Sequence, residues 1–120
     1  MKTSSAKAKG RLLQQKVRDA LRTAGAPYGL VDGDIESRGM GQNGVDVILS
    51  PAAQKVFDLL IECKQVEKLN VVGVFYEHFE KYAAQPGLKL LIHGRNRTEP
   101  MVTMKFSDFM DLLVNQKGKL

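Results

Sequence analysis

Three charged residues lie within two short apolar segments whose other residues are typical of buried β-strands. They are Asp46 in the segment GVDVILS, and Glu62 and Lys64 in the segment LLIECK. Because side chains alternate between the two faces of a strand, Glu62 and Lys64 point to one face while Ile61 and Cys63 point to the other. Carboxylates in an apolar setting carry a desolvation cost that a divalent cation offsets, and hard cations prefer oxygen ligands. These residues therefore predict a cation site.

The two segments must lie side by side for this site to form. We expect Val45–Leu49 and Val56–Lys64 to be strands, joined by a short Ser-Pro turn and paired antiparallel, which would place Asp46 beside Glu62 and Lys64. Hydrophobic spacing and turn residues predict the other elements. These are helices over 10–24, 71–85 and 108–115, and strands over 34–37, 88–93 and 101–106. The expected fold is α/β, with one mixed five-stranded sheet flanked by helices.

Length and composition fit one folded domain. The chain has 120 residues, of which 43% are hydrophobic and 26% charged, values ordinary for a globular protein. No apolar run approaches the roughly 20 residues that span a bilayer, and the single cysteine, Cys63, forms no internal disulfide. We therefore expect a cytoplasmic protein with one domain over residues 10–115, a disordered basic arm over 1–9 and a frayed basic tail over 116–120.

Positive charge is concentrated at the start of the chain. Residues 1–22 hold seven lysines and arginines against one aspartate, whereas the whole chain has a net charge of +5. A basic segment on a compact domain predicts a polyanion partner, and nucleic acid is the commonest for a cytoplasmic protein. The competing interpretation is a solvated tail without a partner.

Two weaker features also have both a functional and a structural interpretation. Gly39, Gly41 and Gly44 form a glycine-rich loop that gives a phosphate close access to the backbone, yet a plain turn between strands needs the same residues. His78 lies on the apolar face of the helix predicted over 71–85, where a histidine is more often packed in the core than a ligand. We therefore expect His78 to be structural.

The order of elements together with Val45-Asp46-Val47 and Ile61-Glu62-Cys63-Lys64 resembles the PD-(D/E)XK nuclease superfamily. That superfamily places a metal-binding Asp on one strand and Glu-X-Lys on the next. Within it, the chain is most similar to small Holliday junction resolvases of archaeal type and their phage relatives. The similar features are the basic start of the first helix, the Ser37 and glycine-rich approach to Asp46, the phrase Leu49-Ser50-Pro51-Ala52-Ala53 and the turn Arg95-Asn96-Arg97.

The resemblance implies a restriction-endonuclease-like αβββαβ core and a Mg²⁺-dependent endonuclease that cuts branched DNA, with Mn²⁺ as a substitute. Asp46 and Glu62 would hold one or two metal ions with the backbone carbonyl of Cys63. Lys64 would either orient or deprotonate the attacking water. The resolvases usually carry a further Glu on the first helix, and Gln14 occupies that position here as a further candidate ligand. The resemblance also implies a homodimer, because a four-way junction needs paired cuts.

The backbone of the DNA would be held by basic side chains without base readout. The candidates are Lys7, Lys9, Arg11, Arg38, Arg95 and Arg97. Three alternatives remain. The chain could be a recombination exonuclease of the same superfamily or a DNA-binding module without cleavage. Alternatively, Glu62 and Lys64 form an ion pair at the end of a sheet that has no function in catalysis. Exonucleases related to the bacterial recombination complex usually show Gln-X-X-X-Tyr after the motif, where this chain has His78 and Tyr82, which favours the resolvase.

Overall fold

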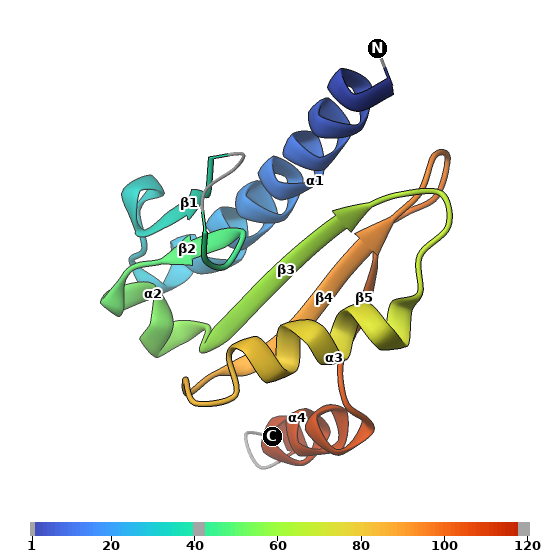
Figure 1. Ribbon diagram of the computed structural model, residues 1–120. Coiled ribbons are helices and arrows are strands. Elements are labelled where there is room, and N and C mark those ends of the chain that lie inside the picture. Colours follow the sequence, from blue (N-terminus) through green and yellow to red (C-terminus); the bar gives the residue numbers. More distant parts are fainter. Residues whose placement is uncertain (1, 40–42, 118–120) are drawn as a thin grey trace.

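The computed structural model describes residues 2–39 and 43–117. It is a mixed α/β structure with four α-helices and five strands (Figure 1). In chain order the elements are α1 (Lys2–Gly25), β1 (Ile35–Ser37), β2 (Val47–Leu49), α2 (Pro51–Val56), β3 (Leu59–Gln65), α3 (Val71–Lys81), β4 (Leu88–Gly94), β5 (Met101–Thr103) and α4 (Phe106–Lys117). The predicted mixture of helices and strands is confirmed, and the particular nuclease core stays a prediction.

Helix α1 is longer than the hydrophobic pattern predicted. Leu13 and Val17 bury one stripe of the helix against the rest of the protein, as their spacing indicates. The helix already begins at Lys2, eight residues before the predicted start at Gly10. The expected disordered arm over 1–9 is therefore wrong for residues 2–9, because alanine and lysine have high helix propensity and extend a helix anchored further along. Residue 1 lies outside the described residues.

The Ser-Pro phrase starts a helix instead of a hairpin turn. The hydroxyl of Ser50 accepts a hydrogen bond from the backbone N–H of Ala53 at 3.1 Å, and Pro51 occupies the first turn of α2. This is a common helix start, because the cap pairs a free N–H and proline needs none. The predicted antiparallel hairpin between Val45–Leu49 and Val56–Lys64 is thus wrong. Strand β2 pairs antiparallel with β1 instead, with Val47 opposite Ser37.

The predicted single sheet of five strands is also wrong, since the strands form two sheets. One contains β1 and β2, and the other has the order β3-β4-β5. Strands β3 and β4 are parallel and are joined by α3, whereas β5 runs antiparallel to β4. A parallel pair needs a long crossover, and a helix is its usual form. Figure 1 shows α1 and α3 on opposite sides of β3.

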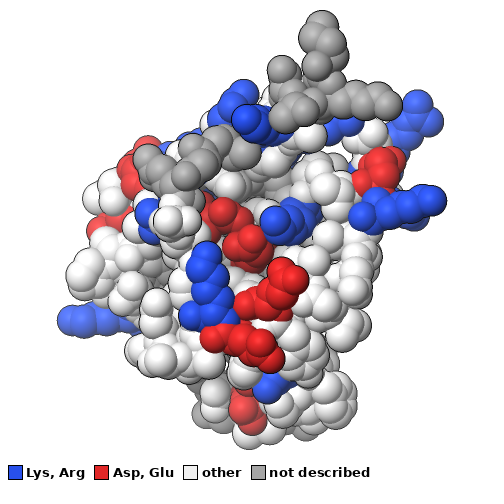
Figure 2. Space-filling view, viewed as in Figure 1, with Lys and Arg blue, Asp and Glu red and all other residues white. Residues whose placement is uncertain are grey.

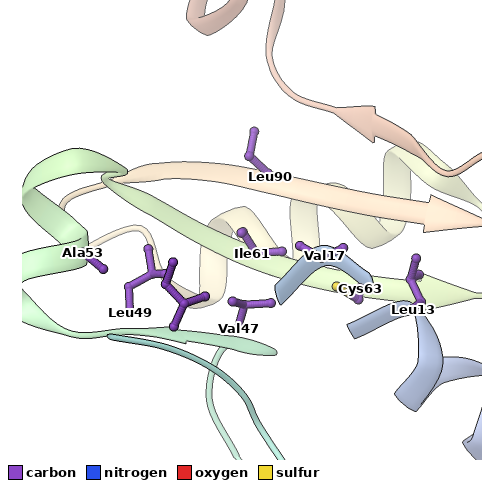
Figure 3. Packing of buried hydrophobic residues seen from close by; sticks show 9 residues of the cluster. Leu13, Val17, Val47, Leu49, Ala53, Ile61, Cys63 and Leu90 are labelled. Carbon is purple, nitrogen blue, oxygen red and sulfur yellow. The ribbon is translucent and has the colours of Figure 1, made fainter. Parts of the chain in front are cut away.

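The core lies between α1, the two sheets and α2 (Figure 3). Its buried side chains come from α1, β1, β2, α2, β3 and β4: Leu13, Val17, Ile35, Val47, Leu49, Ala53, Ile61, Cys63 and Leu90. Ile61 and Cys63 point into this cluster, as strand alternation predicted. Glu62 and Lys64, which alternate with Ile61 and Cys63 along β3, therefore face α3.

Helix α3 covers the other face of β3. Asn70 caps it by accepting a hydrogen bond from the N–H of Gly73 at 3.1 Å, as predicted, but the helix ends at Lys81 instead of Gln85. His78 is buried on this helix, and its Nε2 lies 2.9 Å from the carbonyl oxygen of Leu60. The structural interpretation of His78 is confirmed, because a carbonyl accepts and so fixes the proton on Nε2.

Helix α4 does not dock on the sheet as its sequence suggested. Phe109, Leu112 and Leu113, predicted to pack inward, are 45%, 45% and 41% exposed. Figure 1 shows the helix set apart below α3. The helix extends to Lys117, so residues 116 and 117 of the expected frayed tail are helical, and 118–120 lie outside the described residues. Within the described part of the chain, no helix is long and apolar enough to cross a membrane.

Candidate functional site

The approach to Asp46 is held by Arg38 and Gly44. Gly44 has a φ of 117°, in the left-handed region that favours glycine. The Nε of Arg38 donates a hydrogen bond to the carbonyl of Val45 at 2.7 Å, and its backbone N–H donates to the carbonyl of Asp46 at 2.8 Å. Arg38, expected on the DNA, thus has its guanidinium engaged in fixing this segment. Gly39 and Gly44 lie in a connecting loop, while Gly41 lies outside the described residues.

Asp46 connects the two sheets. Its backbone N–H donates to the carbonyl of Ile61 at 3.0 Å, and its Oδ2 accepts from the backbone N–H of Cys63 at 2.7 Å. The residue before β2 is therefore bonded to β3 through both its backbone and its carboxylate. This arrangement brings Asp46 beside Glu62, as the sequence predicted, by a contact other than the predicted hairpin.

Glu62 and Lys64 line a hollow between β3 and α3. The Nζ of Lys64 lies 3.6 Å from Oε2 of Glu62, with the two side chains 44% and 24% exposed. The hollow has a volume of about 190 Å³, and its other walls are Val74, Glu77, His78 and Lys81 of α3. Figure 2 shows acidic side chains gathered in the middle of this face with lysine and arginine around them. The site is thus a partly enclosed mixture of carboxylates and cations.

Glu77 and Lys81 are site residues that the sequence analysis missed. They follow each other at the i, i+4 spacing on α3, and both line the hollow beside Glu62. That spacing places an acid and a base on one helix face, which was the available signal. The prediction of this helix used its apolar side chains alone and gave no role to the charged pair. Any ligand that reaches Glu62 from α3 must pass these two charges.

Burial raises the pKa of Glu62, and the negative charge of Asp46 raises it further. Lys64 and Lys81 act in the opposite direction without cancelling the shift. Burial likewise raises the pKa of the Cys63 thiol, so the thiol stays protonated and acts as a core side chain. A bound cation would stabilise these two carboxylates, because each disfavours the negative charge of the other.

We expect stability to depend on pH through Glu62. Because its pKa is raised on folding, the folded state binds more protons between the ordinary value of 4.5 and the raised value. The free energy of unfolding contributed by this group therefore falls as pH rises through that window. Glu62→Gln should remove the effect and make the protein more stable at pH 7 in EDTA.

Urea unfolding of the wild type and Glu62→Gln at several pH values checks this prediction. The difference in free energy of unfolding between the two proteins removes the contributions of the other carboxyl groups, which both proteins share. Asp34 is one such group, since hydrogen bonds from Val31 and Ser50 lower its pKa. Adding Mg²⁺ should stabilise the wild type more than the variant. A difference that does not change with pH contradicts the assignment.

The predicted metal ligands come together only in part. Asp46, Glu62 and the backbone of Cys63 are neighbours, while Gln14 is buried at 8% exposure in α1, which packs on the other face of β3. Among residues 2–39 and 43–117, no group of three or more His, Cys, Asp and Glu side chains is arranged to hold a metal. The protein offers two carboxylates, so the remaining donors of any ion would be neutral oxygens or water. Gln14 as a ligand stays a prediction.

A basic groove lies between α1 and the turn that joins β4 to β5. We define it by Lys9 and Lys16 of α1, Gln65 at the end of β3, and Arg95 and Arg97 of the turn; these residues line a hollow of about 270 Å³. Its four basic side chains are all exposed. Lys7 and Arg11 are exposed elsewhere on α1, outside this lining. Three of the six predicted DNA contacts thus converge on one groove.

Glu67 fixes the turn beside the basic groove, and the sequence analysis missed it. Its Oε2 accepts a hydrogen bond from the backbone N–H of Asn96 at 2.7 Å, across 29 residues of sequence. The backbone N–H of Val66 also donates to the carbonyl of Gly94 at 3.1 Å. A single carboxylate after a strand gives no signal of such a distant partner. These bonds hold the turn, and with it Arg95 and Arg97, against the end of β3.

Arg97 has a backbone conformation unusual for a side chain of its kind. Its φ is 67°, and it is the one described residue other than glycine with a positive φ. An L-residue in this region costs about 1–2 kcal/mol. A turn that needs a positive φ would ordinarily contain glycine or asparagine.

We expect Arg97→Asn to leave the fold at least as stable as the wild type, with a gain of up to about 1 kcal/mol, because asparagine tolerates this conformation. The same variant should weaken binding to duplex DNA several-fold at low salt, since one phosphate contact is lost. Thermal unfolding and a fluorescence binding titration measure the two effects. Lys55→Asn, an exposed basic residue of α2 outside the groove, is the matched control. Equal DNA affinity for wild type and Arg97→Asn would contradict a role in the groove.

Comparison with known proteins gives no independent assignment. The fold and site define a mixed α/β protein with a carboxylate pair beside a lysine at the junction of two sheets. No protein-family model, no curated protein and no solved structure matches the chain. Any function is therefore argued from the residues themselves.

Proposed function

We propose that the chain is a metal-dependent, structure-selective DNA endonuclease that cuts phosphodiester bonds in branched DNA, similar to a Holliday junction resolvase of the PD-(D/E)XK superfamily. The observation that carries the proposal is the convergence of Asp46 and Glu62 with Lys64, although 16 residues separate the first two in sequence. The carboxylate of Asp46 accepts a hydrogen bond from the backbone N–H of Cys63, the residue next to Glu62. Their order along the chain, with Glu-X-Lys after Asp, is the pattern of that superfamily.

A divalent cation suits this donor set. Asp46 and Glu62 supply negative oxygen ligands, and because burial and then the charge of Asp46 raise the pKa of Glu62, positive charge would stabilise the pair. We propose that they hold Mg²⁺, or Mn²⁺ in its place, with the carbonyl of Cys63 and with Gln14 as a further candidate. The ion would lower the pKa of water and stabilise charge on the phosphate. Lys64 would orient the attacking water or accept its proton, since its side chain is 44% exposed and lies beside Glu62.

The basic groove gives the DNA backbone a place to bind. Lys9, Lys16, Arg95 and Arg97 are fixed on a helix and a hydrogen-bonded turn, which suits contact with successive phosphates. Gln65 lines the groove and directly follows Lys64 on β3, so the groove lies at the end of the strand that carries the candidate catalytic residues. A duplex arm in the groove would lie close to them.

The test uses synthetic substrates. The full chain is incubated with a four-way junction, a linear duplex and a single strand, each with Mg²⁺ or with EDTA. Paired nicks in the junction that need the metal support the proposal. Degradation from ends would instead favour the recombination exonuclease. Binding to the junction without any cut, in Mg²⁺ and in Mn²⁺, would show a DNA-binding module.

One observation favours that non-catalytic alternative. Helix α1 carries Gln14 where the resolvases have a carboxylate, so the site has one negative ligand fewer. Gln14→Glu provides a direct comparison, because it adds the missing charge at a buried position on α1. If the wild type binds without cutting and Gln14→Glu cuts, the chain has the fold of a nuclease without its activity. His78 and Tyr82 give no support to the exonuclease alternative, because both side chains are buried.

A further inference from the structure

A hollow lies at the carboxyl ends of the parallel strands β3 and β4. Gln65 and Gly94, the last residues of the two strands, are paired in register, and Figure 1 shows both strands ending beside the turn that leads to β5. The hollow has a volume of about 330 Å³, and sites for small organic ligands have about 300–1,000 Å³. Ligands of open α/β sheets usually bind at this end of the strands. We call it the strand-end hollow and define it by six residues that line it: Val66, Leu69, Val71, His93, Glu99 and Met101.

The walls of the strand-end hollow combine apolar surface with an aromatic ring and a carboxylate. Val66 and Met101 are 41% and 62% exposed, so apolar surface is open to a ligand. The Nε2 of His93 lies 2.8 Å from the hydroxyl oxygen of Thr103 on β5, and this contact holds the imidazole ring in place. Glu99 is exposed and forms no ion pair with another described residue. The hollow therefore offers a fixed ring and a carboxylate that a ligand can reach.

Charge distinguishes the strand-end hollow from the basic groove beside it. Glu67 and Glu99 line the strand-end hollow together with Arg95, so its described lining has more acidic than basic side chains. A phosphate is therefore disfavoured there and favoured in the basic groove. Arg95 and Thr98 line both hollows, so the two adjoin at the turn. A nucleotide with its phosphate in the groove would thus have its base beside the strand-end hollow.

An unpaired guanine fits the groups that this hollow presents. Bases outside a duplex stack on histidine rings and form hydrogen bonds along their edges. Guanine has two neighbouring donors on one edge, its ring N–H and its amino group, which match the two oxygens of a single carboxylate. Adenine, cytosine and thymine each have an acceptor beside the donor on the same edge, and that acceptor would face the negative charge. Glu99 therefore favours guanine over the other three bases.

We propose that the strand-end hollow binds an unpaired guanine of a nucleic acid strand whose phosphates lie in the basic groove. The base lies on the ring of His93, and the carboxylate of Glu99 accepts hydrogen bonds from the ring N–H and the amino group. This inference rests on the DNA binding in the proposed function, and it needs neither the metal nor cleavage. A continuous duplex keeps its guanines paired, and opening a base costs least where pairing is already disturbed. The site would therefore favour branched or single-stranded DNA over a duplex.

Titration of the full chain with short DNA strands, in EDTA so that nothing is cut, tests the inference. One fluorescent strand contains thymidine only, and three others have a single guanine, adenine or cytosine at the centre. The guanine strand should bind about 10-fold more tightly than the thymidine strand, a discrimination that one bidentate contact to a base provides. The adenine and cytosine strands should bind like the thymidine strand. Equal affinity for all four strands overturns the inference, and so does the absence of binding to any of them.

Two variants locate the effect. Glu99→Ala should reduce the preference for guanine to about twofold or less, because the edge contact is lost while the cations of the groove remain. His93→Leu, which removes the stacking ring, should weaken binding of the guanine strand several-fold. Because Glu99 is exposed, the first variant is expected to fold even if circular dichroism shows that the second does not.

Glu80→Ala is the matched control, since Glu80 is an exposed glutamate of α3 outside the strand-end hollow. This variant makes the same change in net charge as Glu99→Ala and should keep the full preference for guanine. A preference that Glu99→Ala retains would contradict the site. Guanine-selective binding without junction cleavage in Mg²⁺ or Mn²⁺ would contradict the nuclease proposal alone. Junction cleavage by a protein without a guanine preference would contradict the strand-end site alone.

Discussion

Asp46→Asn is expected to fold like the wild type and to cut a four-way junction at least about 1,000-fold more slowly in Mg²⁺. The asparagine carbonyl can still accept the hydrogen bond that Oδ2 of Asp46 receives from the backbone N–H of Cys63. The negative charge that would hold the cation is lost, and a loss of about 4 kcal/mol in transition-state stabilisation corresponds to a factor of about 1,000. Single-turnover cleavage and urea unfolding measure the two properties separately.

The companion variant Asp46→Ala should lose stability as well as activity. Without the carboxylate, the N–H of Cys63 has lost its partner between the two sheets, which costs about 1–3 kcal/mol. The comparison separates the two functions of Asp46, because both variants remove the charge and only one removes the hydrogen bond. Junction cleavage by Asp46→Asn at the wild-type rate would exclude Asp46 as a metal ligand. Equal stability of the two variants would show that the hydrogen bond to Cys63 contributes little.

Local signals in the sequence predicted an element correctly where a single residue or a regular spacing determines it. Asn70 before an apolar helix pattern predicted the start of α3, and alternation along LLIECK predicted which residues of β3 enter the core. The proximity of Asp46 to Glu62 was also predicted, although from an antiparallel hairpin that the structure does not contain. The start of α3 and the alternation along β3 depend on residues close in sequence or on period, and both are visible without a structure.

Pairing between distant segments was harder to predict. Ser50-Pro51 suits a turn and a helix start equally. Only the structure shows that Ser50 caps α2 by accepting a hydrogen bond from the N–H of Ala53, where the sequence analysis expected a hairpin turn. The two sheets are linked where the side chain of Asp46 accepts a hydrogen bond from the backbone N–H of Cys63, 17 positions further along the chain. Glu67 holds a turn 29 residues away. Such contacts involve residue types, such as serine, aspartate and glutamate, that occur in many structural settings. No local sequence pattern therefore identifies their partners.

The exposed face of α4 shows a different limit. Its apolar spacing correctly predicted an amphipathic helix, but spacing says only that a face will be buried and not by which molecule. Docking on the sheet of the same chain was the simplest interpretation, and the exposure of Phe109 and Leu113 contradicts it within one chain.

Lys64→Gln should reduce junction cleavage about 100- to 1,000-fold with little effect on stability. The ion pair with Glu62 is 3.6 Å long and Lys64 is 44% exposed, and such pairs contribute about 1 kcal/mol or less. A positioned proton acceptor or donor contributes about 100- to 10,000-fold to the rate. Lys81→Gln, on α3 in the wall of the same hollow, is the matched control and should reduce the rate much less. Equal losses in both variants would indicate a general effect of positive charge.

Lys64→Arg distinguishes the two roles that remain open for this residue. Arginine keeps its proton throughout the usable pH range, so it can orient a water and offset phosphate charge but cannot accept a proton. If Lys64 acts by orientation and charge, Lys64→Arg should retain most of the activity that Lys64→Gln loses. If Lys64 accepts the proton of the attacking water, the two variants should be equally slow. Single-turnover rates of the wild type and both variants decide between the two roles, because the group at position 64 is the only difference.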